Sequence, residues 1–173
     1  EIKFMGSANQ SITYPGSLPN LKFDKTGGTV SFDANFTASR NIINLSGTID
    51  PKTSTITLST NHSTITPNGM EFYNLVWNRG NSADTSVTDE LVIRNDFTLT
   101  TANQINTGPI VVKGSFTTTD SSVTGNAQLI FRGSGAQTAN FNGFDIPNGL
   151  VTIDNSAGVT FVGTASLNGS GED

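Results

Sequence analysis

The chain has 173 residues and no cysteine, and its 14 acidic and 9 basic residues give a formal net charge of −5. This length suits one domain, and the acidic balance argues against nucleic acid as a partner, because phosphate binding needs a clustered basic surface. The missing cysteines exclude disulfides and thiol chemistry, and no apolar run approaches the ~18 residues of a membrane span.

Small polar residues dominate the composition. Serine and threonine together number 43, beside 19 asparagines and 18 glycines, while hydrophobic residues make up 34% of the chain. A disordered chain of low hydrophobicity normally carries a high net charge, and −5 is modest for this length. We therefore expect a folded protein rich in threonine and asparagine.

Short β-strands are predicted along the whole chain, because apolar residues alternate with polar ones over three to five positions and no window shows helical spacing. The alternating pairs are, in order, Val30 and Phe32, Phe36 and Ala38, Ile56 and Leu58, Leu75 and Trp77, Leu91 and Ile93, Phe97 and Leu99, Ile110 and Val112, Leu129 and Phe131, Val159 and Phe161, and Ala165 and Leu167. Glycine, asparagine, serine, aspartate or proline bounds each run. The pattern predicts an all-β chain.

A 19-residue repeat organises the middle of the chain. Leu91, Ile110 and Leu129 recur at this spacing, and each is followed by a similar segment: IRNDF at 93–97, VKGSF at 112–116 and FRGSG at 131–135. Ile2 and Leu21 are also 19 residues apart. The repeat indicates a strand, a tight corner and a second strand, with glycine or asparagine where the corner requires a left-handed backbone.

Stacked parallel coils explain this repeat best. If each unit is one coil, residue i lies about 4.8 Å from residue i+19, so that like residues stack on like. We predict a single-stranded, right-handed parallel β-helix, or β-solenoid, with about 19–23 residues per coil. An antiparallel β-sandwich is the alternative, since it also has many short strands, but it gives no reason for identity at a fixed spacing.

A second, longer repeat overlies the first. It divides the single predicted domain, residues 1–173, into units near 1–60, 61–126 and 127–173, and the chain is expected to be a fragment of a longer array. Three sets of residues are predicted to occupy equivalent places in the three units: Gln10, His62 and Gln137; Gly16, Gly69 and Gly143; and Phe23, Trp77 and Ile153.

The longer repeat resembles sequences from repetitive bacterial cell-surface and secreted proteins. Those sequences contain F-x-G-x-x-x-Q, matched by FMGSANQ at 4–10 and FRGSGAQ at 131–137, and F-Y-N-L-x-I-x-N, matched by FYNLVWN at 72–78. The resemblance implies a β-solenoid module of an adhesin-like protein, extracellular or at the cell surface. The chain departs from the pattern at His62, which replaces a glutamine, and at the insertion 79–90.

No catalytic residue, metal ligand or cofactor is expected. His62, the single histidine, stands where the other units have glutamine, which favours a structural polar role over general-base chemistry. Four carboxylates lie close together in sequence, at Asp84, Asp89, Glu90 and Asp96. They could suit calcium, but no calcium-loop motif is present and a solvated loop is favoured.

Three basic residues form the candidate binding site. Arg94, Lys113 and Arg132 follow the three repeated strands at 19-residue spacing, so they should stack on adjacent coils and point outward. Such a stripe could bind an anionic glycan. The alternative, an ordinary exposed face of the coil, is favoured.

We therefore expect a non-enzymatic structural or adhesive module of a bacterial secreted or surface protein. Its expected partners are neighbouring coils or domains, surface glycans, or a host or cell-surface protein. A polysaccharide-binding or polysaccharide-cleaving β-helix, as in lyases and phage tailspikes, is the runner-up. Ice binding is a third interpretation, prompted by threonine-rich segments such as TSTITLST at 53–60 and by the alignment of Thr98 with Thr117.

Overall fold

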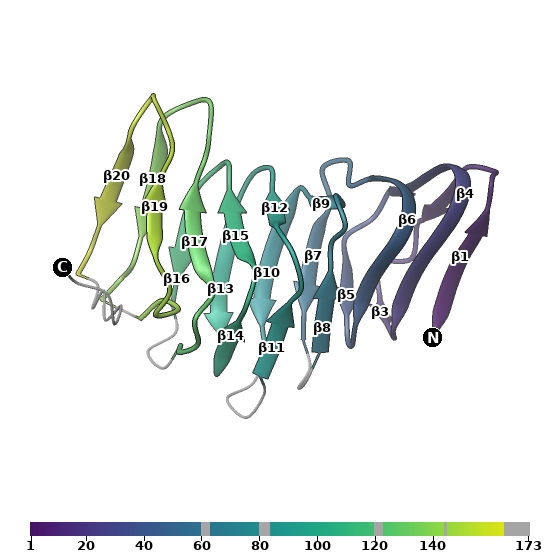
Figure 1. The fold of residues 1–173 in the computed structure, drawn as a ribbon, viewed down its shortest axis with the longest axis horizontal. Coiled ribbons are helices and arrows are strands. Elements are labelled where there is room, and N and C mark those ends of the chain that lie inside the picture. Colours follow the sequence, from purple (N-terminus) through teal and green to yellow (C-terminus); the bar gives the residue numbers. More distant parts are fainter. Residues whose placement is uncertain (60–62, 80–83, 120–122, 144, 165–173) are drawn as a thin grey trace.

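The computed structural model describes residues 1–59, 63–79, 84–119, 123–143 and 145–164, which form a parallel β-solenoid of about seven turns (Figure 1). Every strand pairing in this part of the chain is parallel, and no helix occurs in it. The prediction of a parallel β-helix is confirmed, and the antiparallel sandwich is wrong.

Three sheets run along the solenoid. Sheet A contains β1 (Ile2–Gly6), β4 (Leu21–Phe32), β6 (Ile42–Asp50), β8 (Ser63–Thr66), β11 (Asp84–Val87) and β14 (Gln104–Asn106), with β2 (Gln10–Ile12) paired to the second half of β4. Sheet C contains β9 (Glu71–Phe72), β12 (Leu91–Ile93), β15 (Pro109–Val112), β17 (Gln128–Phe131) and β19 (Val151–Ile153). Sheet B contains β3 (Ser17–Leu18), β5 (Phe36–Ala38), β7 (Thr55–Leu58), β10 (Asn74–Asn78), β13 (Phe97–Thr101), β16 (Phe116–Thr118), β18 (Gln137–Asn140) and β20 (Val159–Val162).

From β8 to β16 the chain visits the sheets in the same order in each turn: first A, then C, then B. After β16 the strands alternate between sheet C (β17 and β19) and sheet B (β18 and β20). In the first three turns the place of sheet C is taken by β2 and by the second halves of β4 and β6, which are continuous with sheet A. The turns from β8 to β16 therefore have three corners, one between each pair of sheets.

The register between turns follows the sequence repeat. Leu91 pairs with Ile110, and Ile110 pairs with Leu129, which is the predicted 19-residue step. The step lengthens elsewhere, reaching 23 residues between Phe116 and Ala139. The predicted range of coil lengths is confirmed, and the register also shifts within strands, between Trp77 and Asn78 of β10 and between Phe23 and Thr29 of β4.

The core consists of inward-facing apolar columns. Side chains alternate across each strand, so that every second residue points inward and meets its equivalent in the next coil. One column on sheet B runs through Phe36, Ile56, Leu75, Phe97 and Phe116, all of them buried. The rings of Phe97 and Phe116 lie with their centroids 5.4 Å apart.

The corners stack closely enough to demand glycine at some positions. Gly125 has a positive φ of 99°, and a Cβ placed on it would lie 2.3 Å from the carbonyl oxygen of Ile105 in the preceding coil. Only glycine fits both the left-handed backbone and this approach. Close stacking of backbone on backbone therefore requires glycine at this corner.

The positions aligned by the longer repeat do not occupy equivalent places, and that prediction is wrong. Phe23 lies in sheet A, Trp77 in sheet B and Ile153 in sheet C. Gln10 begins β2, whereas Gln137 begins β18 of sheet B. Gly16 directly precedes β3 of sheet B, whereas Gly69 lies between β8 and β9, at the corner from sheet A to sheet C, and Gly143 follows β18. His62, Ala165 and Leu167 lie outside the described residues. Similar short sequences, in which an apolar strand residue is followed by polar residues, occur at corners between different sheets. Similarity between two such segments therefore does not show which sheet each segment belongs to. The boundaries near residues 60 and 126 stay a prediction.

Candidate functional site

The outer surface of sheet C carries a column of apolar residues that point away from the core. Val92, Val111 and Ile130 pair in register on successive coils and form a hydrophobic cluster separate from the core. They are nevertheless buried, and Val111 is fully inaccessible to solvent. Side chains on either side of the column must therefore cover it.

The three predicted cations flank this column. The backbone N–H groups of Arg94, Lys113 and Arg132 donate to Phe72, Ile93 and Val112, respectively, each in the preceding coil. Their side chains are partly exposed. The structure thus brings together all three candidate residues on adjacent coils; their role in binding a glycan stays a prediction.

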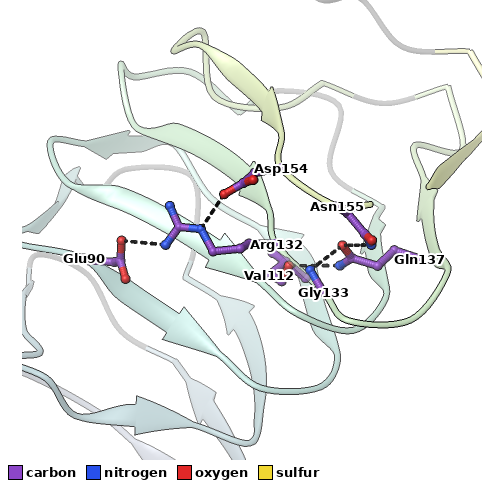
Figure 2. A network of polar contacts seen from close by, with 7 residues as sticks. All are labelled: Glu90, Val112, Arg132, Gly133, Gln137, Asp154 and Asn155. Atoms are coloured by element: carbon purple, nitrogen blue, oxygen red, sulfur yellow. Dashed lines mark hydrogen bonds and ion pairs between the residues drawn. The ribbon is translucent and has the colours of Figure 1, made fainter. Parts of the chain in front are cut away.

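Each cation is paired with a carboxylate that the sequence interpretation did not assign to it. Arg94 and Lys113 both contact Glu71, with 3.1 Å between Lys113 Nζ and Glu71 Oε1. Arg132 lies between two carboxylates, 3.2 Å from Glu90 and 3.0 Å from Asp154 (Figure 2). Three acidic groups therefore balance the three basic groups, and the stripe is not a free cationic surface.

Glu71 is the most enclosed of these carboxylates. Its partial burial opposes ionisation, but hydrogen bonds from Arg94 and Lys113 outweigh burial and hold the pKa of the carboxyl below its ordinary value. Glu71 is therefore ionised at neutral pH, and its charge neutralises part of the stripe.

The ion pairs extend over the apolar column. Glu90 precedes β12, and Arg132 follows β17 two coils further on, so the contact between them crosses Val111 of the intervening β15. Long basic side chains cover apolar surface with their alkyl stems while their charged ends stay in water. This arrangement accounts for the complete burial of an outward-facing valine.

A buried glutamine closes the corner between sheets C and B (Figure 2). The Nε2 group of Gln137 donates to the carbonyl oxygens of Val112 at 2.9 Å and Gly114 at 2.6 Å, both in the preceding coil. Its Oε1 accepts hydrogen bonds from the backbone of Gly133 and from the side chain of Asn155 in the following coil. The last residue of the F-x-G-x-x-x-Q motif therefore links three successive coils.

Two cations lie inside the fold. Lys25, which is 3% exposed, donates from Nζ to the carbonyl oxygen of Ala8 at 2.5 Å and to Oε1 of Gln10 at 2.8 Å, and so holds the corner of the first coil. Arg79 is fully buried beside the ring of Trp77, and burial lowers the pKa of its guanidinium to about 10. Neither cation is presented to an external ligand.

A hollow lies at the corner between β4 and β5, against the turn that precedes β7. It has a volume of about 410 Å³ and is lined by Phe32, Asp33, Ala34, Asn35, Lys52, Thr53 and Ser54. A second hollow of about 280 Å³ shares Asn35 and continues over the outer face of sheet B, past Thr37, Thr55 and Thr57. Hydroxyl and amide groups line both hollows, and the first also has the charged side chains of Asp33 and Lys52, which suits a hydroxyl-rich ligand better than an apolar one.

The outward column of sheet B is rich in threonine but irregular. It runs through Ser17, Thr37, Thr57, Val76, Thr98, Thr117 and Asn140. Thr98 and Thr117 pair as predicted. Val76 interrupts the column, and Asn140 ends the threonine run, so the regular hydroxyl row that ice binding requires does not form.

Within the described residues, no three histidine or acidic side chains lie close enough to hold a metal ion. Among the four clustered carboxylates, Asp89 accepts the backbone N–H of Asn68, Asp96 accepts that of Ser115, and Glu90 pairs with Arg132. These three groups therefore contact other coils, and the side chain of Asp84 lies outside the described part of the structure.

Searches of protein-family models, curated proteins and solved structures found no match to this chain. Across the described residues there is no helix of the length and apolar character that crossing a membrane requires.

Proposed function

We propose that the protein is a non-enzymatic structural or adhesive module of a bacterial secreted or surface protein, located outside the cell. One observation carries the proposal: buried polar side chains and the charged side chains of sheet C form hydrogen bonds and ion pairs between coils. Lys25 and Gln137 tie the corners, and the cations of sheet C bind carboxylates of other coils. A chain with this use of its polar groups suits a rigid spacer.

The adhesive part of the proposal is tested on a glycan array that includes sulfated and carboxylated glycans. One variant replaces Arg94, Lys113 and Arg132 with serine, and the matched variant replaces their partners, Glu71→Gln, Glu90→Gln and Asp154→Asn. If the cations bind an anionic glycan, the serine variant loses binding and the neutralised variant gains it, because the acidic competitors are removed. Binding unaffected by both variants excludes the stripe, and no binding to any glycan or cell surface refutes the adhesive role.

A polysaccharide-binding or polysaccharide-cleaving role is the second candidate, and the hollow around Asn35 favours it. Its polar lining and its continuation over sheet B would suit part of a glycan chain. Incubation with neutral and acidic polysaccharides, followed by assay of new reducing ends and by NMR titration, separates binding from cleavage. Release of sugar ends would overturn the non-enzymatic proposal.

A further inference from the structure

The corner hollow between β4 and β5 has a carboxylate oxygen at its rim that can accept a hydrogen bond from a ligand. Asp33 Oδ2 accepts a hydrogen bond from Ser31 Oγ at 3.1 Å. The backbone N–H of Asp33 donates to the carbonyl oxygen of Ile12 in the preceding coil, which fixes the position of the residue. Within the described part of the chain nothing donates to Asp33 Oδ1, so this oxygen is an acceptor for a bound group.

Asn35 supplies a hydrogen-bond donor. Its Oδ1 accepts the backbone N–H of Thr55 at 2.7 Å, and because only the amide oxygen can accept from an N–H group, the orientation of the side chain is fixed. The Nδ2 group therefore faces away from this bond, and no described residue accepts its hydrogens. Asn35 lines both hollows, so the amide donor lies where they meet.

The corner hollow also contains a strained lysine. Lys52 has a positive φ of 49°, a left-handed conformation that glycine and asparagine tolerate better than lysine. Its ammonium group pairs with Asp50 at 2.7 Å, but both side chains are exposed, so this pair contributes little to stability. Thr107, which is also left-handed, donates from Oγ1 to Val87 in the preceding coil and so joins two coils. Strain that joins no coils is typical of a ligand-binding site.

The charges around the corner hollow favour a neutral ligand. Hydrogen bonds from Lys52 hold the pKa of Asp50 below its usual value, and the hydrogen bond to Asp50 and the charge of Asp33 raise the pKa of Lys52. One ammonium group therefore lies within electrostatic range of two carboxylates. The carboxylates disfavour an acidic ligand, and the ammonium group disfavours a basic one.

The second hollow extends this surface over sheet B. Thr37 and Thr57 pair in register on adjacent coils, whose strands are about 4.8 Å apart. No described residue forms a hydrogen bond with either hydroxyl group. A hydroxyl group both donates and accepts, and so do the hydroxyl groups of a sugar. A ligand with hydroxyl groups repeated along its length therefore matches the surface that leads away from Asn35.

We propose that a neutral glycan binds in these two hollows, with one sugar unit at the corner and the next over Thr37 and Thr57. Asp33 Oδ1 accepts a hydrogen bond from one sugar hydroxyl group, and Asn35 Nδ2 and Lys52 Nζ donate to others. This inference rests on the polysaccharide-binding role given above as the second candidate function. It adds the place of binding on the molecule and the charge of the ligand.

NMR titration of the isotope-labelled 173-residue chain tests the proposal. The probes are short neutral oligosaccharides of glucose, galactose, mannose and N-acetylglucosamine. At least one of them should shift the side-chain amide signal of Asn35 and the backbone signals of residues 33–35 and 52–57, and the shifts should saturate. The same titration with sulfated and carboxylated oligosaccharides should leave these signals unchanged, because Asp33 disfavours an anion.

Three variants remove the proposed contacts, and each should weaken binding by about tenfold or more. Asp33→Ala removes the acceptor. Asn35→Asp removes the amide donor but keeps the oxygen that accepts from Thr55, so the corner is retained. Lys52→Asn removes the ammonium group and places a residue that tolerates the left-handed backbone. Thr138→Ala, at an exposed position of β18 on sheet B, is the matched control and should bind as the unmodified chain does.

Lys52→Asn also separates binding from folding. It should raise the melting temperature by relieving strain while it weakens binding; a loss of binding with a lower melting temperature would overturn the role of Lys52. The proposal is overturned if no neutral oligosaccharide binds or if any of the three variants binds as tightly as the unmodified chain. A neutral oligosaccharide that shifts signals elsewhere overturns the site but supports the polysaccharide-binding role. Binding of anionic glycans alone overturns the site and leaves the adhesive role standing.

Discussion

Replacing Gln137 with leucine should destabilise the solenoid strongly. The leucine keeps most of the side-chain volume but loses four hydrogen bonds: two that Gln137 donates, to Val112 and Gly114, and two that it accepts, from Gly133 and Asn155. Each such bond contributes about 1 kcal/mol net. Asn155 is partly exposed and can bind water instead, so we expect a loss of about 3 kcal/mol in the free energy of unfolding.

Urea denaturation followed by far-UV circular dichroism measures this loss, and fluorescence of the single, buried Trp77 supplies a second probe. For a chain of this size, ~3 kcal/mol also lowers the melting temperature by about 6–12 °C. Gln128→Leu is the matched control, because Gln128 is exposed on β17, and it should change stability by no more than about 0.5 kcal/mol. A loss below ~1 kcal/mol for Gln137→Leu would refute the role assigned to this corner.

Three further predictions concern the corners and the surface of sheet C. Gly125→Ala should lower the free energy of unfolding in urea by ~2–4 kcal/mol, because the new Cβ would meet backbone and the φ of this residue is positive. Gly135→Ala, with open space around it, should lower it far less, and equal effects would contradict the close corner stacking. Glu71→Gln should cost about 0.5–1 kcal/mol at neutral pH. The pKa of Glu71 is lower in the folded state than in the unfolded state, so ionised Glu71 stabilises the fold above the unfolded pKa, and this stabilisation is lost as pH falls through the folded pKa. The free energies of unfolding of the unmodified chain and of Glu71→Gln should therefore converge in acid. A difference that persists in acid would contradict the ion pairs. Val111→Thr should lower the free energy of unfolding by ~1–2 kcal/mol because it buries a hydroxyl group. Val76 is half-exposed in a column rich in threonine, so Val76→Thr should leave stability nearly unchanged. Thermal melts that show the larger loss for Val76→Thr would exclude a covered valine column.

The sequence predicted the coil because the 19-residue step joins consecutive strands in the middle of the chain. Leu91, Ile110 and Leu129 recur with no insertion between them, so their spacing is the register itself. The longer repeat gave a wrong alignment of positions because its two matching motifs lie at different corners. The corner of FMGSANQ joins β1 to β2, while that of FRGSGAQ joins sheet C to sheet B. Both motifs describe how a strand turns, and neither specifies which face the strand is on.

The sequence correctly placed the three basic residues on adjacent coils, but it did not reveal the carboxylates that neutralise their charge. Arg94, Lys113 and Arg132 share the constant 19-residue step, whereas Glu71 lies 21 residues before its register partner Val92. Asp154 follows a strand whose step from β17 is 22 residues. Finding these partners required the length of every intervening corner, and the sequence gives no signal for that length.

The spacing of successive coils tests the central claim, that each turn stacks on the last in a fixed register. The chain lacks cysteine, so pairs of spin labels can be attached to engineered cysteines at Ser17 and, in turn, Thr98, Thr117 and Asn140, which are four, five and six register steps away in the outward column of sheet B. Pulsed electron paramagnetic resonance should give distances near ~19, ~24 and ~29 Å, an increase of about 4.8 Å per coil, the spacing of neighbouring strands. Distances that fail to increase in this order would contradict the stacked solenoid.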